Sequence, residues 1–152
     1  MSDFRFISDK FLSENEVVSN IEEIPLDNRH GSSPIVSEHE FSRTVHNTLK
    51  FGTAKEISGL VKTSVWTLIQ TEVEKNLTKT IGAEIGETIT RRATVRLEAA
   101  PGKMVKYELI WKQKQRTGHA LISIKNREIQ LPYTSMYGLF HSVKSIHFEG
   151  AN

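Results

Sequence analysis

Six histidines are the side chains best suited to chemistry in this chain, at positions 30, 39, 46, 119, 141 and 147. A zinc site on a helix commonly uses two histidines four residues apart, and His-Glu-x-x-His adds the general base of a metalloprotease. No pair among the six has that spacing. His39 with His46, or His141 with His147, could meet only through the tertiary fold. We therefore interpret the histidines as ordinary surface or interface residues and predict no metal site.

Other catalytic signatures are also missing from the sequence. The chain has no cysteine, which excludes disulfides, thiol chemistry and thiolate metal sites. It has no glycine-rich phosphate loop and no Gly-x-Ser-x-Gly elbow, and no pair of carboxylates stands out from the surface charge. We predict a non-enzymatic protein with no cofactor and no small-molecule substrate. A catalytic group assembled from distant residues is the alternative, because sequence cannot show a spatial triad.

Length and charge predict one domain with a distinct N-terminal region. A chain of 152 residues can form one domain with a real core and is too short for two of ordinary size. Residues 1–40 hold three basic and nine acidic side chains, a net charge of −6, whereas residues 41–152 hold seventeen and nine, a net charge of +8. We predict an acidic, partly flexible lead-in at 1–40, with one short strand or helical turn near Glu14–Ile21, and a single β-rich domain at 41–152. The acidic region either competes for the basic body or is simply a solvated surface.

The N-terminal segment MSDFRFISDKFLSENEVV does not resemble an export signal. It is acidic where a signal peptide needs basic residues followed by a continuous apolar run. No stretch of about eighteen apolar residues occurs elsewhere. We expect a cytoplasmic protein that would meet an outer membrane surface only after release.

The most unusual feature is a tract from Ile57 to Leu97 in which apolar residues occupy most odd positions and few even ones. Alternation with period two, together with many β-branched residues, is typical of half-buried strands. Because strands usually have three to ten residues, we predict two arms, 57–73 and 81–97, joined by a charged turn near Asn76. The side of the tract predicted to enter a membrane or to self-associate comprises Ile57, Val61, Val65, Ile69, Val73, Leu77, Ile81, Ile85 and Ile89.

A helix is the alternative for the first arm. Apolar residues between Ile57 and Ile69 also fit the i, i+3, i+4 spacing of an amphipathic helical face. Beyond Ile69 they recur at every fourth position, and at about 100° per residue such a stripe drifts around a helix. We favour strand for 57–80, keep a long amphipathic helix at about 55–81 as the alternative, and predict strand for 87–99.

Shorter alternating runs and turn residues surround the tract. Alternation covers Phe41–Phe51 and 104–115, and turns are predicted at 27–34, Ala100–Lys103, Arg116–Gly118 and Lys125–Arg127. The predicted fold class is mainly β, an antiparallel β-sandwich or elongated sheet with a long amphipathic central segment. Its alternative is α+β, a β-sandwich plus the helix at about 55–81.

Lysines stand beside Tyr107 and Trp111 in the segment 103–116, which resembles a nucleic-acid platform in composition. Such a platform needs aromatic rings and cations exposed on the same face. Tyr107 and Trp111 instead share their side of the strand with Val105 and Leu109. We therefore predict that the rings belong to the core and that the chain does not bind nucleic acid.

Four segments between Phe41 and Trp111 resemble the pore-forming module of the aerolysin superfamily, including its epsilon-toxin and mosquitocidal-toxin branch. They are FSRTVHNTLKF, residues 57–85, ETITRRATVRLEAAPGK and MVKYELIW. In those proteins a Ser/Thr-rich strand leads into an alternating segment that becomes a transmembrane hairpin, and the return strand ends near a Pro-Gly turn. The likeness covers about half of the chain and is one of pattern.

The resemblance implies a membrane-acting module that forms homo-oligomers. Ile57–Val73 and Ile81–Val95 could supply the hairpin, because a membrane strand needs about nine to eleven residues with one lipid-facing side. Backbone groups are satisfied in lipid only when strands close on one another, which implies several copies. The runner-up is a soluble intracellular protein–protein interaction or assembly module, in which the tract packs against copies of itself or a partner.

Overall fold

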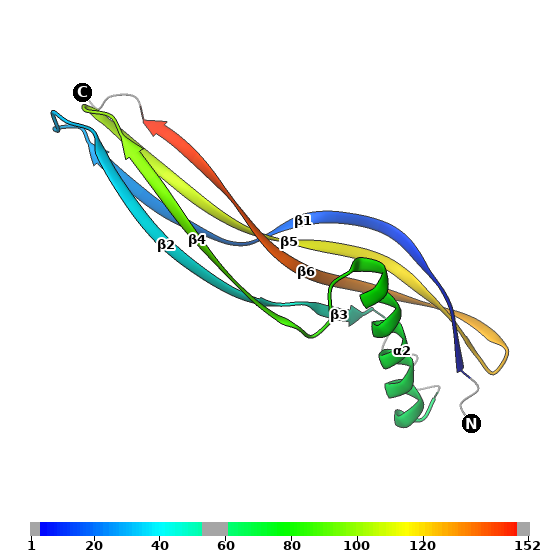
Figure 1. Cartoon of the computed structure of the whole chain (residues 1–152). Helices are drawn as coiled ribbons and strands as arrows, with labels where there is room; N and C mark the ends of the chain where they lie inside the picture. Colours follow the sequence, from blue (N-terminus) through cyan, green and yellow to red (C-terminus); the bar gives the residue numbers. More distant parts are fainter. Residues whose placement is uncertain (1–3, 53–60, 149–152) are drawn as a thin grey trace. The chain divides into compact units, whose positions relative to one another are not determined.

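The computed structural model describes residues 4–52 and 61–148, and this part of the chain is mainly β with one helix (Figure 1). Four strands form one sheet in the order β1-β5-β6-β3, and β2 and β4 form a second sheet. The predicted mainly β class with antiparallel sheets is confirmed. The elements are β1 (Phe4–Asn28), β2 (Ile35–His46), β3 (Thr48–Phe51), α2 (Thr63–Ile81), β4 (Thr88–Ala99), β5 (Lys103–Ile124) and β6 (Arg127–Phe148).

The chain divides into two compact units. Unit one comprises Met1–Glu16, His46–Thr88 and Lys114–Gly138, and unit two comprises Val17–Val45, Ile89–Gln113 and Leu139–Asn152. The strands β1, β5 and β6 have 25, 22 and 22 residues, and each of them supplies residues to both units. Each unit has its own cluster of buried apolar side chains.

The core of unit two is built from alternating residues of both sheets. On β4 the odd positions from Ala93 to Ala99 are buried and the even positions are exposed. Because successive side chains of a strand point to opposite faces, the period-two pattern of this segment translates directly into one buried face. The predicted strand at 87–99 is confirmed. The cluster comprises Ile24, Val45, Ala93, Val95, Leu97, Leu109, Trp111 and Leu139.

The core of unit one is built from a helix against a sheet. Ile69, Val73 and Leu77 of α2 are at most 1% exposed, and they lie four residues apart on one helical face. They pack with buried residues of the long strands, namely Ala120, Ile122 and Ile124 of β5 and Leu131 and Tyr133 of β6. Figure 1 shows α2 beside these strands.

The strand preferred for residues 57–80 is therefore wrong, and so is the turn near Asn76, which lies inside α2. The helical alternative holds over Thr63–Ile81, whereas residues 53–60 lie outside the described part of the chain. The expected drift of the apolar stripe around the helix does not prevent a helix. Only three members of the stripe, Ile69, Val73 and Leu77, are fully buried. The helix ends where Gly82 adopts a φ of 73° and donates its N–H to the carbonyl of Thr78, a conformation that glycine adopts without strain.

Two of the predicted turns are confirmed, and one is wrong. At Ala100–Lys103, the N–H of Lys103 donates to the carbonyl of Ala100 at 3.1 Å, and Gly102 has a φ of 80°. Lys125 and Asn126 both have positive φ, as a two-residue hairpin turn requires. Arg116–Gly118, in contrast, lies within β5. Gly118 serves there as a point of close approach between strands, since a Cβ would lie 2.6 Å from the carbonyl oxygen of Lys10 on β1.

The N-terminal residues form a longer element than the short strand or helical turn that the sequence predicts. The strand β1 runs from Phe4 to Asn28 and is an outer strand of its sheet. It contributes Phe4 and Phe6 to the core of unit one and Ile24 and Leu26 to the core of unit two. The predicted loop follows, with β2 beginning at Ile35.

Candidate functional site

The structure places the predicted insertion residues in several different settings. Five of them lie on α2, of which three are fully buried and the two nearest its ends, Val65 and Ile81, are half-buried. Val61 and Ile85 lie on either side of the helix and pack against the same core, whereas Ile89 belongs to β4 and to the core of unit two. Ile57 lies outside the described residues. Seven predicted positions thus belong to two different cores, and Ile81 at the end of the helix belongs to neither. The helix α2 with the loop that follows it is the candidate functional site.

The composition of α2 gives it little intrinsic tendency to be helical. Nearly half of its sequence, TSVWTLIQTEVEKNLTKTI, is Thr, Val or Ile, which lose side-chain rotamer freedom in a helix. The residue at the N-cap is Lys62, which makes no side-chain capping hydrogen bond, and the first turn has no acidic residue to offset the helix dipole. Packing of one face, more than local preference, therefore holds α2 in place.

Polar side chains of α2 bond back to the helix itself. The hydroxyls of Thr67 and Thr71 donate to the carbonyls four residues earlier at 3.0 and 2.9 Å. Thr80 does the same toward Asn76, and the Asn76 amide donates to the carbonyl of Glu72. Such back-bonding satisfies the hydroxyls and slightly destabilises a helix. None of these bonds ties α2 to the sheet.

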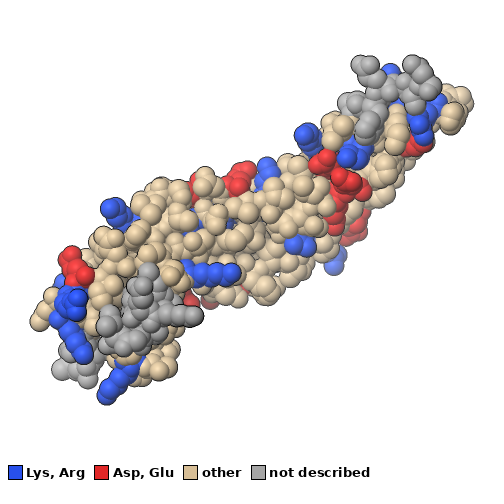
Figure 2. Space-filling view, turned by 180° about the vertical axis from the view of Figure 1, so that it is seen from behind, with Lys and Arg blue, Asp and Glu red and all other residues tan. Residues whose placement is uncertain are grey.

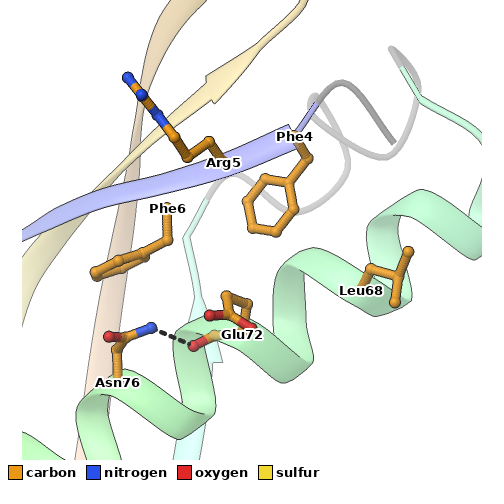
Figure 3. Close-up of a pocket in the computed structure, with 6 residues that line it drawn as sticks. All are labelled: Phe4, Arg5, Phe6, Leu68, Glu72 and Asn76. Atoms are coloured by element: carbon orange, nitrogen blue, oxygen red, sulfur yellow. Dashed lines mark hydrogen bonds between the residues drawn. The ribbon is translucent and has the colours of Figure 1, made fainter. Parts of the chain in front are cut away.

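A pocket of about 470 Å³ separates part of α2 from the first residues of β1 (Figure 3). Phe4 and Phe6 point from β1 toward the helix, whereas Arg5 between them points away. The opposite wall is formed by Leu68, Glu72 and Asn76, and Leu68 is 52% exposed. One long side of α2 is therefore packed on the sheet, and another faces an open pocket.

Asn47 anchors the loop that connects α2 to β4. It is 1% exposed and lies between β2 and β3. Its backbone N–H donates to Glu87, its carbonyl accepts from Gly86, and its side-chain amide donates to the carbonyl of Glu84 at 2.9 Å. Its side-chain oxygen also accepts from the N–H of Gly138 at 3.0 Å. The backbone and the side-chain amide of this one buried residue together hold the loop on the sheet.

A charged cluster that sequence reasoning missed joins three strands of unit one. Arg116 on β5 donates to Asp9 on β1 at 2.9 Å and to the Tyr133 hydroxyl on β6 at 3.1 Å. The Tyr133 hydroxyl donates to Asp9 at 2.6 Å, and the Phe11 ring centroid lies 4.6 Å from the guanidinium carbon of Arg116. Burial and the hydrogen bond to Asp9 raise the pKa of Tyr133 to about 12. Asp9 and Arg116 are 107 residues apart, so no local pattern could have revealed the cluster.

Other kinds of site do not emerge from the described residues. Within 4–52 and 61–148, no group of three His, Asp or Glu side chains could hold a metal ion. In the same part of the chain, α2 lacks the apolar character that a membrane-spanning helix requires. The histidines are dispersed: His39 stacks on Phe41 in unit two, and Trp111 lies against His141 there.

Comparisons with known proteins identify a shared fold. No family model matches the chain, and no curated protein matches it. A crystal structure from Bacteroides vulgatus ATCC 8482, described as a "putative pore-forming toxin", is similar with a TM-score of 0.50 and 8% identity over 93% of this chain. An aerolysin-like protein of Bombina maxima aligns over 95% of this chain and 98% of that one, with a TM-score of 0.39 and 12% identity.

This chain spans 57% of the length of the Bacteroides vulgatus protein. At 8% identity the likeness concerns the fold and not the chemistry of individual residues. The resemblance that the sequence pattern predicts is confirmed as a likeness of fold.

Proposed function

We propose that this chain is a self-associating, membrane-acting module of the pore-forming kind. In this proposal α2 and the loop that follows it leave the core of unit one and enter the membrane as strands. The observation that carries the proposal is that α2 combines a helical structure with a sequence suited to strands. The fold shared with a protein described as a "putative pore-forming toxin" supports it.

The two structures of this segment would use the same apolar residues. In the helix, Ile69, Val73 and Leu77 form one buried stripe because they lie four residues apart. In an extended strand, they lie on one side because their positions are all odd. Thr63–Val73 has the nine to eleven residues that a membrane strand needs. Over Thr63–Val73 a change of structure therefore keeps Val65, Ile69 and Val73 on one side, with threonines between them.

Release of α2 into water alone would be unfavourable. Full exposure of three buried aliphatic side chains costs roughly 1.5–3 kcal/mol each. A lipid surface can accept those side chains, so it would remove most of this cost. Release would also cost the contact of Trp66 with Phe51, whereas the weak intrinsic helicity of α2 and the pocket on its β1 side limit the remaining loss. Membrane contact would thus favour the change.

The test is dye release from lipid vesicles of varied composition, with variants that stabilise the helix. Thr67→Ala with Thr71→Ala acts at exposed sites of α2, and each change favours a helix by about 0.5 kcal/mol. We expect release to slow about fivefold. The matched control makes the same change at exposed strand positions, Thr90→Ala with Thr94→Ala, and should alter the rate less than twofold.

Two results would contradict the proposal. A wild-type protein that neither binds nor permeabilises vesicles of any composition would exclude membrane action and favour the assembly module. Equal rates for the α2 variant and its control would exclude the conversion of α2 as a slow step.

A further inference from the structure

The two strands of the smaller sheet carry opposite charges on their exposed side chains. On β2 the acidic residues Glu38 and Glu40 are exposed, and on β4 the basic residues Arg92 and Arg96 are exposed. Glu98 at the end of β4 offsets part of this positive charge, since it lies 3.7 Å from Arg96. The alternation of both strands places these groups on the outer face, away from the core of unit two.

Among the described residues, one ion pair joins these acidic and basic side chains within a single chain, and it is loose. Arg92 and Glu40 are 3.9 Å apart, with side chains 78% and 62% exposed. Pairs as exposed as this contribute little to stability. Both side chains are therefore accessible to a partner. Figure 2, which presents the opposite face of the molecule from Figure 1, shows acidic side chains gathered in a few groups while Lys and Arg are scattered.

Both strands also have one edge without a neighbouring strand, although at the end of β4 the backbone N–H and carbonyl of Glu98 both bond to the Tyr107 hydroxyl. The sheet order is β2-β4, so within the described residues each strand has a single neighbour. Free edges invite pairing with another chain unless proline or other features block them. Neither β2 nor β4 contains proline. The outer strand β1 of the other sheet differs in this respect. It contains Pro25, which lacks a backbone N–H, and its Ser19 carbonyl already accepts a hydrogen bond from Arg43.

Exposed apolar side chains mark the beginning of β2. Ile35 is 37% exposed and Val36 is 48% exposed. A neighbouring strand would cover part of this surface, and cross-strand contacts of β-branched side chains stabilise a sheet. The acidic edge thus offers apolar contact as well as charge.

From these observations we propose that a second copy of this chain docks the free edge of its β4 on the free edge of β2. The inference rests on the proposed self-association and identifies the surfaces that perform it. Opposite charges favour β2 beside the β4 of another copy, and like charges oppose β2 beside β2 or β4 beside β4. A contact between two different edges repeats from copy to copy, so it closes into a ring or continues as a filament.

The test reverses the charge of each edge separately. One variant is Glu38→Lys with Glu40→Lys, and the other is Arg92→Glu with Arg96→Glu. Average mass is measured by sedimentation at micromolar concentration, and by chemical crosslinking on vesicles. We expect each variant alone to associate at least tenfold more weakly than wild type. An equimolar mixture of the two should form mixed pairs, because one reversed edge then meets an edge of opposite charge.

A combined variant and a control guard against loss of the fold. The chain with all four substitutions has both edges reversed, so it should self-associate again. The control, Lys125→Glu with Arg127→Glu, makes the same charge change at the exposed β5–β6 turn of unit one and should associate like wild type. Circular dichroism and the melting temperature verify that each variant is folded.

Three outcomes would overturn the inference: wild-type association by either single-edge variant, no pairing in the mixture, or a wild-type protein that is monomeric both in solution and on vesicles. Failure of the proposed function looks different. Charge-dependent association without dye release would retain this interface and reject membrane action. Dye release that is equal in wild type and in the edge-charge variants would retain membrane action and reject this interface.

Discussion

Unit one and unit two draw on the same three long strands but cover them differently. In unit two the second sheet supplies the covering residues, and the buried positions of β4 follow the alternation of its sequence. In unit one α2 supplies them, although its sequence alternates in much the same way. The difference teaches that period two identifies a strand reliably only where a neighbouring strand is present to pair with it.

The largest expected effect is in the core of unit two. Trp111 is 0% exposed, and its indole nitrogen has no hydrogen-bond partner, so its contribution is packing. We expect Trp111→Ala to lower the free energy of unfolding by about 3–5 kcal/mol, measured by urea unfolding with circular dichroism. The same change at Trp66, which is only half-buried in unit one, should cost clearly less. An equal loss at both sites would contradict the difference between the two cores.

The next effect tests what holds α2. Ile69→Ala removes a fully buried side chain from the helix and should cost about 2–5 kcal/mol. Hydrogen exchange should show faster exchange of α2 amides, with β4 amides less affected. The neighbouring substitution Leu68→Ala, at a position 52% exposed, is the control and should change little. Equal protection of α2 in both variants would mean that helix propensity, not packing, holds the segment.

The charged cluster of unit one predicts a loss of stability at high pH. A tyrosine in an unfolded chain has a pKa of 10.0, whereas the pKa of Tyr133 in the folded protein is raised to about 12. Between these values the unfolded chain loses this proton first, so the free energy of unfolding should fall as pH rises from about 10 to 12. Melting temperature against pH measures this decline. Tyr133→Phe should remove this part of it, and an unchanged decline would assign the effect to other groups.

The smallest expected effect concerns the start of α2. Lys62→Ser would place a hydroxyl at the N-cap, where the native side chain makes no capping bond, and should stabilise the helix by about 1 kcal/mol. Slower hydrogen exchange in α2 is the readout. Lys79→Ser is the opposite control, because it removes the basic residue of the last turn and should weaken the helix slightly. Faster exchange after Lys62→Ser would show that capping does not limit α2.

Where the buried residues alternate along one strand, the sequence by itself was enough to predict the strand and its buried side. The alternation of 87–99 and of 104–115 predicted β4 and the first half of β5, including the buried Val105, Leu109 and Trp111. The Pro-Gly turn between them was predicted for the same reason, since its geometry depends on residues next to one another. Local rules suffice when the deciding contacts are local or repeat at a fixed spacing.

Only the tertiary structure decided what depends on distant partners. The segment of α2 is compatible with two periods, and burial against Ile122 and Leu131 selects the helix. The length of β1 and the continuity of β5 through Gly118 depend on neighbouring strands, and the Asp9–Arg116–Tyr133 cluster joins residues more than a hundred positions apart. Asn47 gave only a weak hint, a polar residue within an alternating run. Packing and hydrogen bonding across the sheet supplied the information that spacing along the chain could not.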